Sequence, residues 1–501
     1  MIYEGGMRTM TETAKKKRGM PSSFTILLAL LAIVAVITVI VSGTSGGEVT
    51  AARLSDFCTA PILGFADALP VCLFVMILGG FLGMMTETGA LDNGIAVLVQ
   101  KLKGNEIMLV PVLMLIFSLG GTTYGMCEET VPFYALLAAT MMAAGFDPMV
   151  GAATVLLGAG CGCLGSTVNP FAVGAAVDAL TGVDIAVNQS IIIGLGGVLW
   201  LVTTVMSIVF VMNYAKKVKA DKGSTILSMQ ELEDAEAAHG KAASEVNKEV
   251  KLTGRQKGVL IAFAFTFVVM IVGFIPLADL NEGVANFFDA GAVYDADGNT
   301  VVQGWSALIT GLPIGQWYFD EASTWFFLMA ILIGIIGGLS EKQIVNTFIT
   351  GAADMMSVVL VIALARGISV LMASTGLDVY VLDAAANALA GLSGVIFAPM
   401  SFLVYFGLSF LIPSTSGMAT VSMPIMGPLA VKLGFSPEVM VMIFSAAIGV
   451  VNLFTPTSGA IMGGLALAKI EWTTWLKFAL KLIVALSVVC AVILTVACVM
   501  L

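Results

Sequence analysis

The chain has 501 residues, of which 58% are apolar and 11% are charged, and its formal net charge is −10. Soluble proteins carry about 25% charged residues, so this composition excludes an ordinary soluble protein and places most of the chain in a membrane. The single histidine, His239, lies in a polar segment, which argues against a multi-histidine metal site or a histidine-based triad. The seven cysteines lack the paired spacing of a zinc site or a disulfide framework, so we do not expect an enzyme.

Apolar segments of about 20 residues predict membrane crossings. The first follows a basic tail over 1–21 and is longer than the core of a cleavable signal, so we expect an anchor helix with a cytoplasmic N-terminus. Nine full crossings are predicted, at 22–42, 66–87, 148–180, 190–213, 257–278, 324–339, 350–374, 436–468 and 473–500. Two further apolar segments, 107–143 and 395–433, are interrupted at mid-length by Gly, Ser, Thr and Pro. We interpret each as a re-entrant hairpin, although two short spans would also fit.

The charged residues predict the orientation of the chain. The segment 215–256 is rich in Lys and Arg and should be a cytoplasmic linker, because loops on that side carry the basic excess. The segment 279–323 contains acids but no Lys or Arg, so we expect it to face the periplasm. These segments and the connecting helix 257–278 separate a first transmembrane repeat, 22–214, from a second, 324–501.

The two halves of the chain repeat each other. Between residues 66 and 89, eight of 24 positions match the residue 287 positions later. The shared positions, including those of the interrupted segments, are not only apolar: Asp67/Asp354, Gly80/Gly367, Thr88/Thr375, Thr123/Thr415 and Pro132/Pro424. Because one crossing separates the halves, equivalent elements enter the membrane from opposite sides. The predicted fold is therefore an all-α integral membrane protein with an inverted repeat, two re-entrant hairpins and two broken transmembrane helices.

Polar residues gather at the two hairpin tips and the two helix breaks. Hydroxyls, amides and freed carbonyls suit a hard cation, and half-helix N-termini suit a carboxylate, although helix capping and interhelical hydrogen bonds are an alternative role. The first candidate half-site is Thr122, Thr123, Ser166, Thr167 and Asn169, and the second is Ser414, Thr415, Ser416, Thr455, Thr457 and Ser458. The candidate sodium ligands are Thr123, Ser166 and Asn169 in the first half, and Thr415, Asn452 and Thr457 in the second.

Three charged residues distinguish the halves. Glu128 and Glu129 follow the first tip, and no acid follows the second, so the shared scaffold does not require them. We expect one of them to bind substrate, the alternative being acids favoured in a first helical turn. Arg366 lies where the first half has Gly79, and an intramembrane arginine is normally paired. It could bind a substrate carboxylate, replace a cation during transport, or form an ion pair with Asp354 or a neighbouring acid.

Two motifs carry a resemblance to a known family. Residues 125–134, read as GMCEETVPFY, and residues 166–171, read as STVNPF, are similar to the YfcC-type group of the C4-dicarboxylate anaerobic carrier (DcuC-like) family. The resemblance covers roughly 20–500 and implies the ion transporter superfamily, with a homodimeric scaffold, mobile transport domains and elevator-type movement in a bacterial inner membrane. Relatives with the Gly-Met-x-Glu-Glu pattern resemble arginine/ornithine exchangers of bacterial arginine catabolism. The tips here depart from the Ser-Asn-Thr order of many sodium carriers in this superfamily.

The residues and the resemblance together predict a secondary transporter of amino acids. Two acids beside the first tip favour a guanidinium or ammonium group, hence basic amino acids, moved by exchange or by cation-coupled uptake. The alternative is a sodium- or proton-coupled C4-dicarboxylate carrier, in which Arg366 and the helix N-termini bind the substrate. We expect a small-molecule substrate, the lipid bilayer and a second copy of the chain as partners, no nucleic acid, and no cofactor beyond Na⁺ or H⁺ as a candidate coupling ion.

Overall fold

The computed structural model describes residues 23–501 except 92, 95–96, 98–104, 247–250, 276, 281 and 296–299. The predicted tail over 1–21 therefore lies outside the described residues. In the described part the regular structure is helical apart from one antiparallel hairpin of strands β1 (Val293–Tyr294) and β2 (Thr300–Val302). The prediction of an all-α membrane protein is confirmed.

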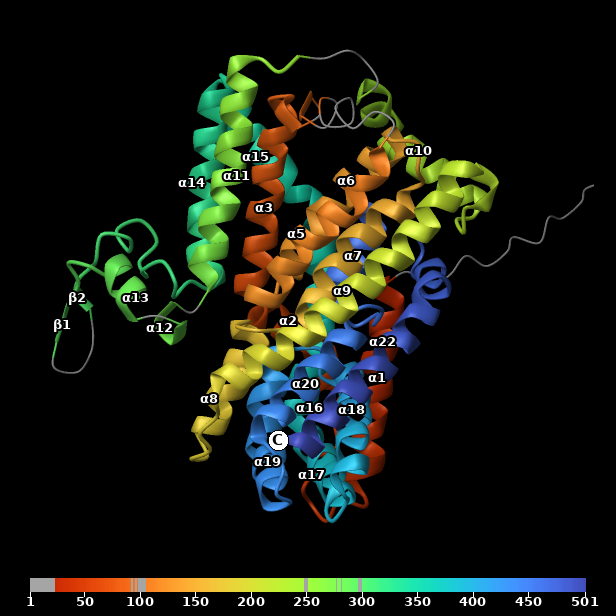
Figure 1. Cartoon of the computed structure of the whole chain (residues 1–501), viewed down its shortest axis with the longest axis vertical. Helices are drawn as coiled ribbons and strands as arrows, with labels where there is room; N and C mark the ends of the chain where they lie inside the picture. Colours follow the sequence, from red (N-terminus) through yellow and green to blue (C-terminus); the bar gives the residue numbers. More distant parts are fainter. Residues whose placement is uncertain are drawn as a thin grey trace, which may run out of the picture.

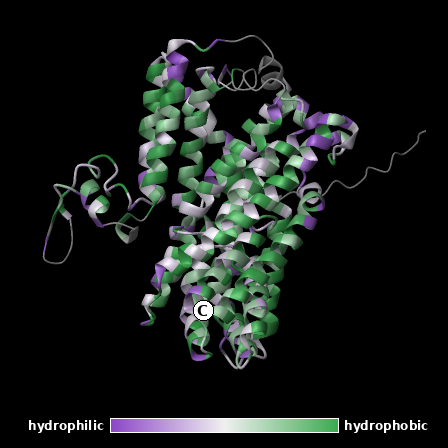
Figure 2. Cartoon of the chain, viewed as in Figure 1, coloured by the Kyte–Doolittle hydropathy of each residue, from purple (hydrophilic) through white to green (hydrophobic). Residues whose placement is uncertain are grey.

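Nine helices among the described residues are long and apolar enough to cross a membrane. Seven coincide with predicted crossings, namely those over 24–42, 69–87, 189–220, 254–274, 319–337, 356–375 and 472–500. The other two are first arms of the predicted hairpins, over 106–124 and 394–411. The predicted crossings 148–180 and 436–468 consist instead of shorter helices, because each is interrupted at its polar break. Figure 2 shows hydrophobic residues along the length of the helices and most of the hydrophilic residues at their ends.

One group of helices, which we call the crossed bundle, is built on two long interrupted helices. Its members are α1 (Ser23–Ser42), α2 (Leu54–Asp67), α3 (Leu69–Glu87), α11 (Gly254–Phe274), α14 (Phe319–Gly337), α15 (Glu341–Asp354) and α16 (Met356–Thr375). Helix α2 packs on α16, and α3 packs on α15 and α14. In Figure 1, α3, α11, α14 and α15 stand together at one side of the molecule.

Close glycine contacts hold the crossed bundle together. A Cβ on Gly64 would collide with the backbone of Gly367, where α2 meets α16. A Cβ on Gly351 would likewise collide with the backbone of Gly79, where α15 meets α3. Small residues allow helix backbones to approach this closely in a membrane. The interrupted helix α2–α3 and the interrupted helix α15–α16 are therefore fixed against each other at two points.

The second group, which we call the hairpin bundle, contains both predicted hairpins and both breaks. From the first half come η1 (Glu106–Met108), α5 (Leu109–Tyr124), η2 (Glu128–Thr130), α6 (Val131–Ala143), α7 (Pro148–Leu164), η3 (Pro170–Gly174), α8 (Ala175–Thr181) and α9 (Gln189–Ala220). From the second half come α18 (Gly394–Leu411), α19 (Thr415–Lys432), α20 (Pro437–Val451), α21 (Gly459–Leu467) and α22 (Trp472–Met500), with α17 (Leu377–Leu389) packed on α19. Helix α7 contacts both α5 and α6, and α20 contacts both α18 and α19. Figure 1 shows the α5–α6 pair and the α18–α19 pair in opposite halves of the molecule.

The two polar segments between the main helices are largely ordered. After the turn η4 (Lys222–Ser224), the linker forms α10 (Met229–Val246), which packs on α6. Glu231 of α10 accepts a hydrogen bond from the backbone N–H of Glu471 at 2.9 Å, and the ring Nε2 of His239 lies 3.0 Å from the carbonyl of Leu467. On the other side, α12 (Leu277–Leu280), α13 (Glu282–Phe288) and the β-hairpin form the appendage that projects from α11 and α14 in Figure 1. The linker helix is thus attached to the hairpin bundle.

Candidate functional site

The first hairpin turns through a left-handed glycine. Helix α5 ends at Tyr124, and Gly125 follows with φ of 77°, a conformation that residues with a side chain rarely adopt. A Cβ at this position would also meet the side-chain amide of Asn169, which packs against the glycine. The chain then re-enters helical structure at Glu128. Glycine is therefore required both for the turn and for the approach of the helix break.

The break after α7 is tied to this tip by hydrogen bonds. Thr122 donates its hydroxyl to the carbonyl of Gly165 at 2.6 Å, and the backbone N–H of Thr167 donates to the carbonyl of Thr122 at 2.9 Å. The hydroxyl of Thr167 donates to the same carbonyl at 3.0 Å. These bonds satisfy part of the backbone that the break leaves unpaired, as buried backbone at membrane depth requires. Thr122 and Thr167 hold the tip and the break together.

Asn169 starts the next helical segment. Its side-chain oxygen accepts hydrogen bonds from the N–H groups of Phe171 and Ala172, and its amide donates to the hydroxyl of Ser166 at 3.0 Å. Ser166 in turn donates to the carbonyl of Cys163 at 2.6 Å. Pro170, the first residue of η3, needs no N–H partner and its fixed φ suits a helix start. Asn169 is consequently both an N-cap and a residue that faces the cavity described next.

The second half presents two helix starts. Ser414 caps α19 by accepting from the N–H of Gly417 at 3.1 Å, and Ser458 caps α21 by accepting from the N–H of Ile461 at 3.5 Å. Thr455 and Thr457, which precede α21, share a hydroxyl–hydroxyl hydrogen bond of 2.7 Å. N-cap side chains leave part of the first helical turn available to a ligand.

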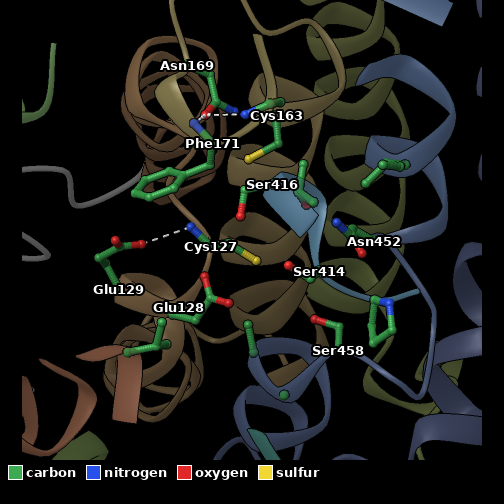
Figure 3. Close-up of a pocket in the computed structure, with 18 of the residues that line it drawn as sticks. Cys127, Glu128, Glu129, Cys163, Asn169, Phe171, Ser414, Ser416, Asn452 and Ser458 are labelled. Carbon is green, nitrogen blue, oxygen red and sulfur yellow. Dashed lines mark hydrogen bonds between the residues drawn. The ribbon is translucent and has the colours of Figure 1, made fainter. Parts of the chain in front are cut away.

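A cavity of about 460 Å³ lies where the tips and breaks meet. This volume is in the range of small-molecule sites, about 300–1,000 Å³. Ten predicted residues line it: Glu128, Glu129, Asn169, Arg366, Ser414, Thr415, Ser416, Asn452, Thr457 and Ser458. The lining does not include five others, Thr122, Thr123, Ser166, Thr167 and Thr455. Figure 3 shows Glu128 and Cys127 facing Ser414, Ser416, Ser458 and Asn452 across the open space.

The two neighbouring glutamates have different surroundings. Glu129 is 1% exposed, and its carboxylate accepts a hydrogen bond from the backbone N–H of Cys127 at 3.0 Å. This bond gives the N–H in the turn a partner. Glu128 is half-buried and points into the space between the two halves (Figure 3). The geometry therefore assigns a turn-stabilising contact to Glu129 and leaves the carboxylate of Glu128 facing the cavity.

Arg366 enters the cavity from the crossed bundle. Its Nε lies 3.2 Å from the carboxylate of Asp67 at the end of α2. The ion pair we considered from sequence was with Asp354 or a neighbouring acid, and the partner is Asp67. Asp354 is exposed and has no ion pair within the described residues, because it lies at the far crossing of the bundle. Asp67 also lines the cavity, so the ion pair lies at its wall.

Comparison with known proteins identifies the family of this site. The family model of the C4-dicarboxylate anaerobic carriers (DcuC) matches residues 48–499. The chain belongs to this carrier family. It is 29% identical over 443 residues to an uncharacterized protein of Haemophilus influenzae, covering 88% of this chain and 78% of that protein. It is 27% identical over 440 residues to the Escherichia coli K12 protein named "Putative basic amino acid antiporter YfcC", covering 86% and 77%. The protein is accordingly a multi-pass membrane transporter of small molecules, not an enzyme.

Two solved structures show a distant similarity to this DcuC-family carrier. One is MtrF of Neisseria gonorrhoeae, whose structure is described as that of an antimetabolite efflux pump. It is 17% identical with a TM-score of 0.43, and the match covers 97% of this chain and 96% of MtrF. The YdaH transporter of Alcanivorax borkumensis is 16% identical with a TM-score of 0.45 and covers 95% and 98%.

The carrier's cavity also contains residues that the sequence did not point to. Asp178 of α8 and the aromatic pair of Tyr318 and Phe319, at the start of α14, contribute to the lining. Phe319 stacks on Phe171 with ring centroids 5.3 Å apart, which joins the crossed bundle to the helix break. Asp178 lies only nine residues after Asn169, but its position in a short helix gave no signal of a site. The aromatic contact joins residues far apart in the chain, so only the fold brings it together.

Proposed function

We propose that this carrier exchanges basic amino acids. The observation that carries the proposal is the charge of the cavity: four carboxylates, those of Asp67, Glu128, Glu129 and Asp178, line it together with a single guanidinium among the described residues. That guanidinium, on Arg366, already has a carboxylate partner in Asp67. An excess of carboxylates in a site of low dielectric favours a cationic ligand over a dianion.

Each end of a basic amino acid has a chemically matched group. The carboxylate of Glu128 can accept charge-assisted hydrogen bonds from a guanidinium or ammonium group. The α-carboxylate can approach the helix starts at Ser414 and Ser458, whose first turns carry positive partial charge. Ser416 and Asn452, on the same wall, offer further polar atoms (Figure 3). The name of the Escherichia coli relative, a basic amino acid antiporter, agrees with this choice.

A second candidate remains a C4-dicarboxylate, moved with sodium or protons. The family's description and the helix starts at Asn169, Ser414 and Ser458 favour it. It requires Arg366 to leave Asp67 for the substrate, and it leaves Glu128 facing a dianion. We therefore rank it second.

We propose that access alternates by movement of the hairpin bundle along the crossed bundle, in the manner of an elevator. Two glycine contacts support an inverted repeat as the basis of this movement. Gly64 meets Gly367, and Gly351 meets the backbone of Gly79 beside Gly80. Positions 64 and 351 are 287 residues apart, and so are positions 80 and 367, which is the offset of the sequence repeat. Related halves can exchange roles when a carrier switches its open side.

The remaining expectations complete the proposal. The basic linker with α10 lies in the cytoplasm together with the N-terminus, the segment 279–323 faces the periplasm, and two copies assemble in a bacterial inner membrane. Exchange needs no coupling ion. The candidate sodium ligands Thr123 and Ser166 donate their hydroxyls to the carbonyls of Leu119 and Cys163 and do not line the cavity.

Counterflow in proteoliposomes tests the proposal. Vesicles loaded with unlabelled arginine, ornithine, succinate or no solute are given external labelled arginine or labelled succinate. We expect arginine to enter only vesicles loaded with arginine or ornithine, without a sodium or proton gradient. Succinate uptake driven by such a gradient, with no arginine counterflow, would establish the second candidate instead.

A further inference from the structure

Arg366 and Glu128 belong to different bundles but face the same cavity. Arg366 lies on α16, and its partner Asp67 ends α2. The crossing of Gly64 and Gly367 fixes these two helices together. Glu128, in contrast, starts the turn η2 at the tip of the first hairpin. Any movement of one bundle along the other must therefore change the separation of these two charges.

In the present arrangement both charged side chains line the same cavity, Glu128 from the tip of the first hairpin and Arg366 from α16. Arg366 contacts Asp67 through Nε, while its side chain is 26% exposed and that of Asp67 is 53% exposed. Because the contact with Asp67 uses Nε, the guanidinium has two further nitrogens with which it can bind a second acid without loss of the Asp67 contact.

The repeat shows that this arginine is not part of the common framework. Asp67 corresponds to Asp354, and Arg366 corresponds to Gly79. Glu128 corresponds to Thr420 when the tips are matched through Thr123/Thr415. The first half therefore holds the acidic tip, the second half holds the arginine, and neither charge has a counterpart in the other half. The shared scaffold consequently requires neither of the two charges.

We propose that Arg366 is the internal counter-cation of Glu128 in the empty carrier. In the absence of substrate, its attraction to Glu128 holds the hairpin bundle in place against the crossed bundle. A cationic substrate neutralises Glu128, Arg366 is retained by Asp67, and the loaded bundle is released to move. The empty carrier is thereby prevented from returning, which makes exchange obligatory. This inference rests on the proposed function and adds the residue that sets the coupling.

The first test is a thermal double-mutant cycle without any substrate. Arg366→Gln removes the cation from both Glu128 and Asp67 and should lower Tm by about 2–4 °C. Adding Glu128→Gln should restore the part of this loss that comes from Glu128, while the part that comes from Asp67 remains. Arg366→Lys keeps the charge and should retain most of the coupling, which separates charge from packing. Additive effects of the two single changes would overturn the inference. This readout does not depend on which substrate the carrier moves.

The second test compares exchange with net efflux in proteoliposomes loaded with labelled arginine. For the natural protein we expect rapid efflux into arginine or ornithine and slow efflux into substrate-free buffer. Arg366→Gln should raise the ratio of efflux into substrate-free buffer to exchange at least ~10-fold, because the empty bundle is free to return. Asp67→Asn should raise KM for exchange, since Arg366 then competes more strongly for Glu128.

The repeat supplies the control. Asp354→Asn removes the equivalent acid, which faces no arginine, and should change neither KM nor the ratio of efflux to exchange. Loss of both exchange and efflux in Arg366→Gln, with weaker substrate binding, would show that Arg366 binds the substrate and would overturn the inference. A positive thermal cycle in a protein that exchanges no basic amino acid would refute the proposed function and leave the counter-ion pair standing. Exchange of basic amino acids by the natural protein, together with additive effects of the two changes on Tm, would support the proposed function and refute the counter-ion pair.

Discussion

The two hairpin tips perform the same structural task with different chemistry. At the first tip, the chain turns at Gly125, forms a short acidic turn at Glu128, and is bonded to its own helix break through Thr122. At the second tip, Ser414 starts α19 directly and no acid follows. The second break is attached outward, by hydrogen bonds from Trp472 and Trp475 to the carbonyls of Phe454 and Leu453. Helix breaks and caps are thus common to both halves of the molecule, whereas acidic residues are found at the first tip and not at the second.

Removing the charge from the first tip should have the largest effect on transport. Glu128→Gln deletes the carboxylate that faces the cavity, and a lost charge-assisted contact of about 3 kcal/mol corresponds to a fall in kcat/KM for arginine of roughly 100-fold. Thr420→Val alters the equivalent position of the second tip, where the hydroxyl donates to the carbonyl of Ser416 in its own helix, and should leave transport within about 2-fold. Glu129→Gln retains an acceptor for the N–H of Cys127 and should cost less than Glu128→Gln. Equal uptake by Glu128→Gln and the natural protein would refute the site.

A change in packing should also have a larger effect at the first tip than at the second. A Cβ on Gly121 would collide with the backbone of Ala159 and of Cys163, so Gly121→Ala should destabilise the fold by at least about 2 kcal/mol. At Gly417 the nearest atom is the hydroxyl of Ser414 at 2.9 Å, a side chain that can rotate. Gly417→Ala should consequently lower the free energy of unfolding by less. Thermal unfolding of the two purified variants decides this, and similar losses would contradict the asymmetry in packing.

The caps of the second half should contribute moderately. Ser414→Ala and Ser458→Ala each remove one N-cap acceptor and should cost about 1 kcal/mol of stability. Both also face the proposed position of the α-carboxylate, so KM should rise more than kcat falls. Replacement of Ser436, which caps α20 away from the cavity, provides the matched control. If Ser436→Ala raises KM as much as the other two changes, the caps do not recognise the substrate.

The smallest expected effect is a pH dependence of the packing of α10 against the first hairpin. Burial lowers the pKa of His239, whose ring lies against the carbonyl of Leu467 and whose helix α10 covers α6 of the first hairpin. Because the folded pKa is below the unfolded value, this contribution to docking is present above pH of about 6.5 and decreases as pH falls. Limited proteolysis should therefore release α10 more readily in acid, and His239→Gln should reduce that dependence. The second hairpin, covered by α17, should show no such change.

The fold was predictable from sequence wherever composition and local chemistry were sufficient. Apolar length predicted seven of the spans, and Gly, Pro, Ser and Asn predicted the positions of both tips and both breaks. The two broken crossings were counted as full spans because hydropathy averages over the polar interruption. Ten of the predicted site residues line one cavity, since residues at breaks in the membrane must either face a cavity or bond to each other. Thr122 and Thr167 bond to each other instead of facing the cavity. The sequence does not show which of the two roles a hydroxyl residue at a break will have.

By itself, the sequence determined that the chain spans a membrane and that the first tip alone is acidic, and it predicted that the two halves are related. These properties depend on composition and on residues near each other in the chain. Only the tertiary structure decided which glutamate faces the cavity, that Arg366 pairs with Asp67 rather than Asp354, and that Phe319 closes on Phe171. Each of these depends on the crossing of helices hundreds of residues apart. Their backbones approach through glycines, whose partners cannot be read from local sequence.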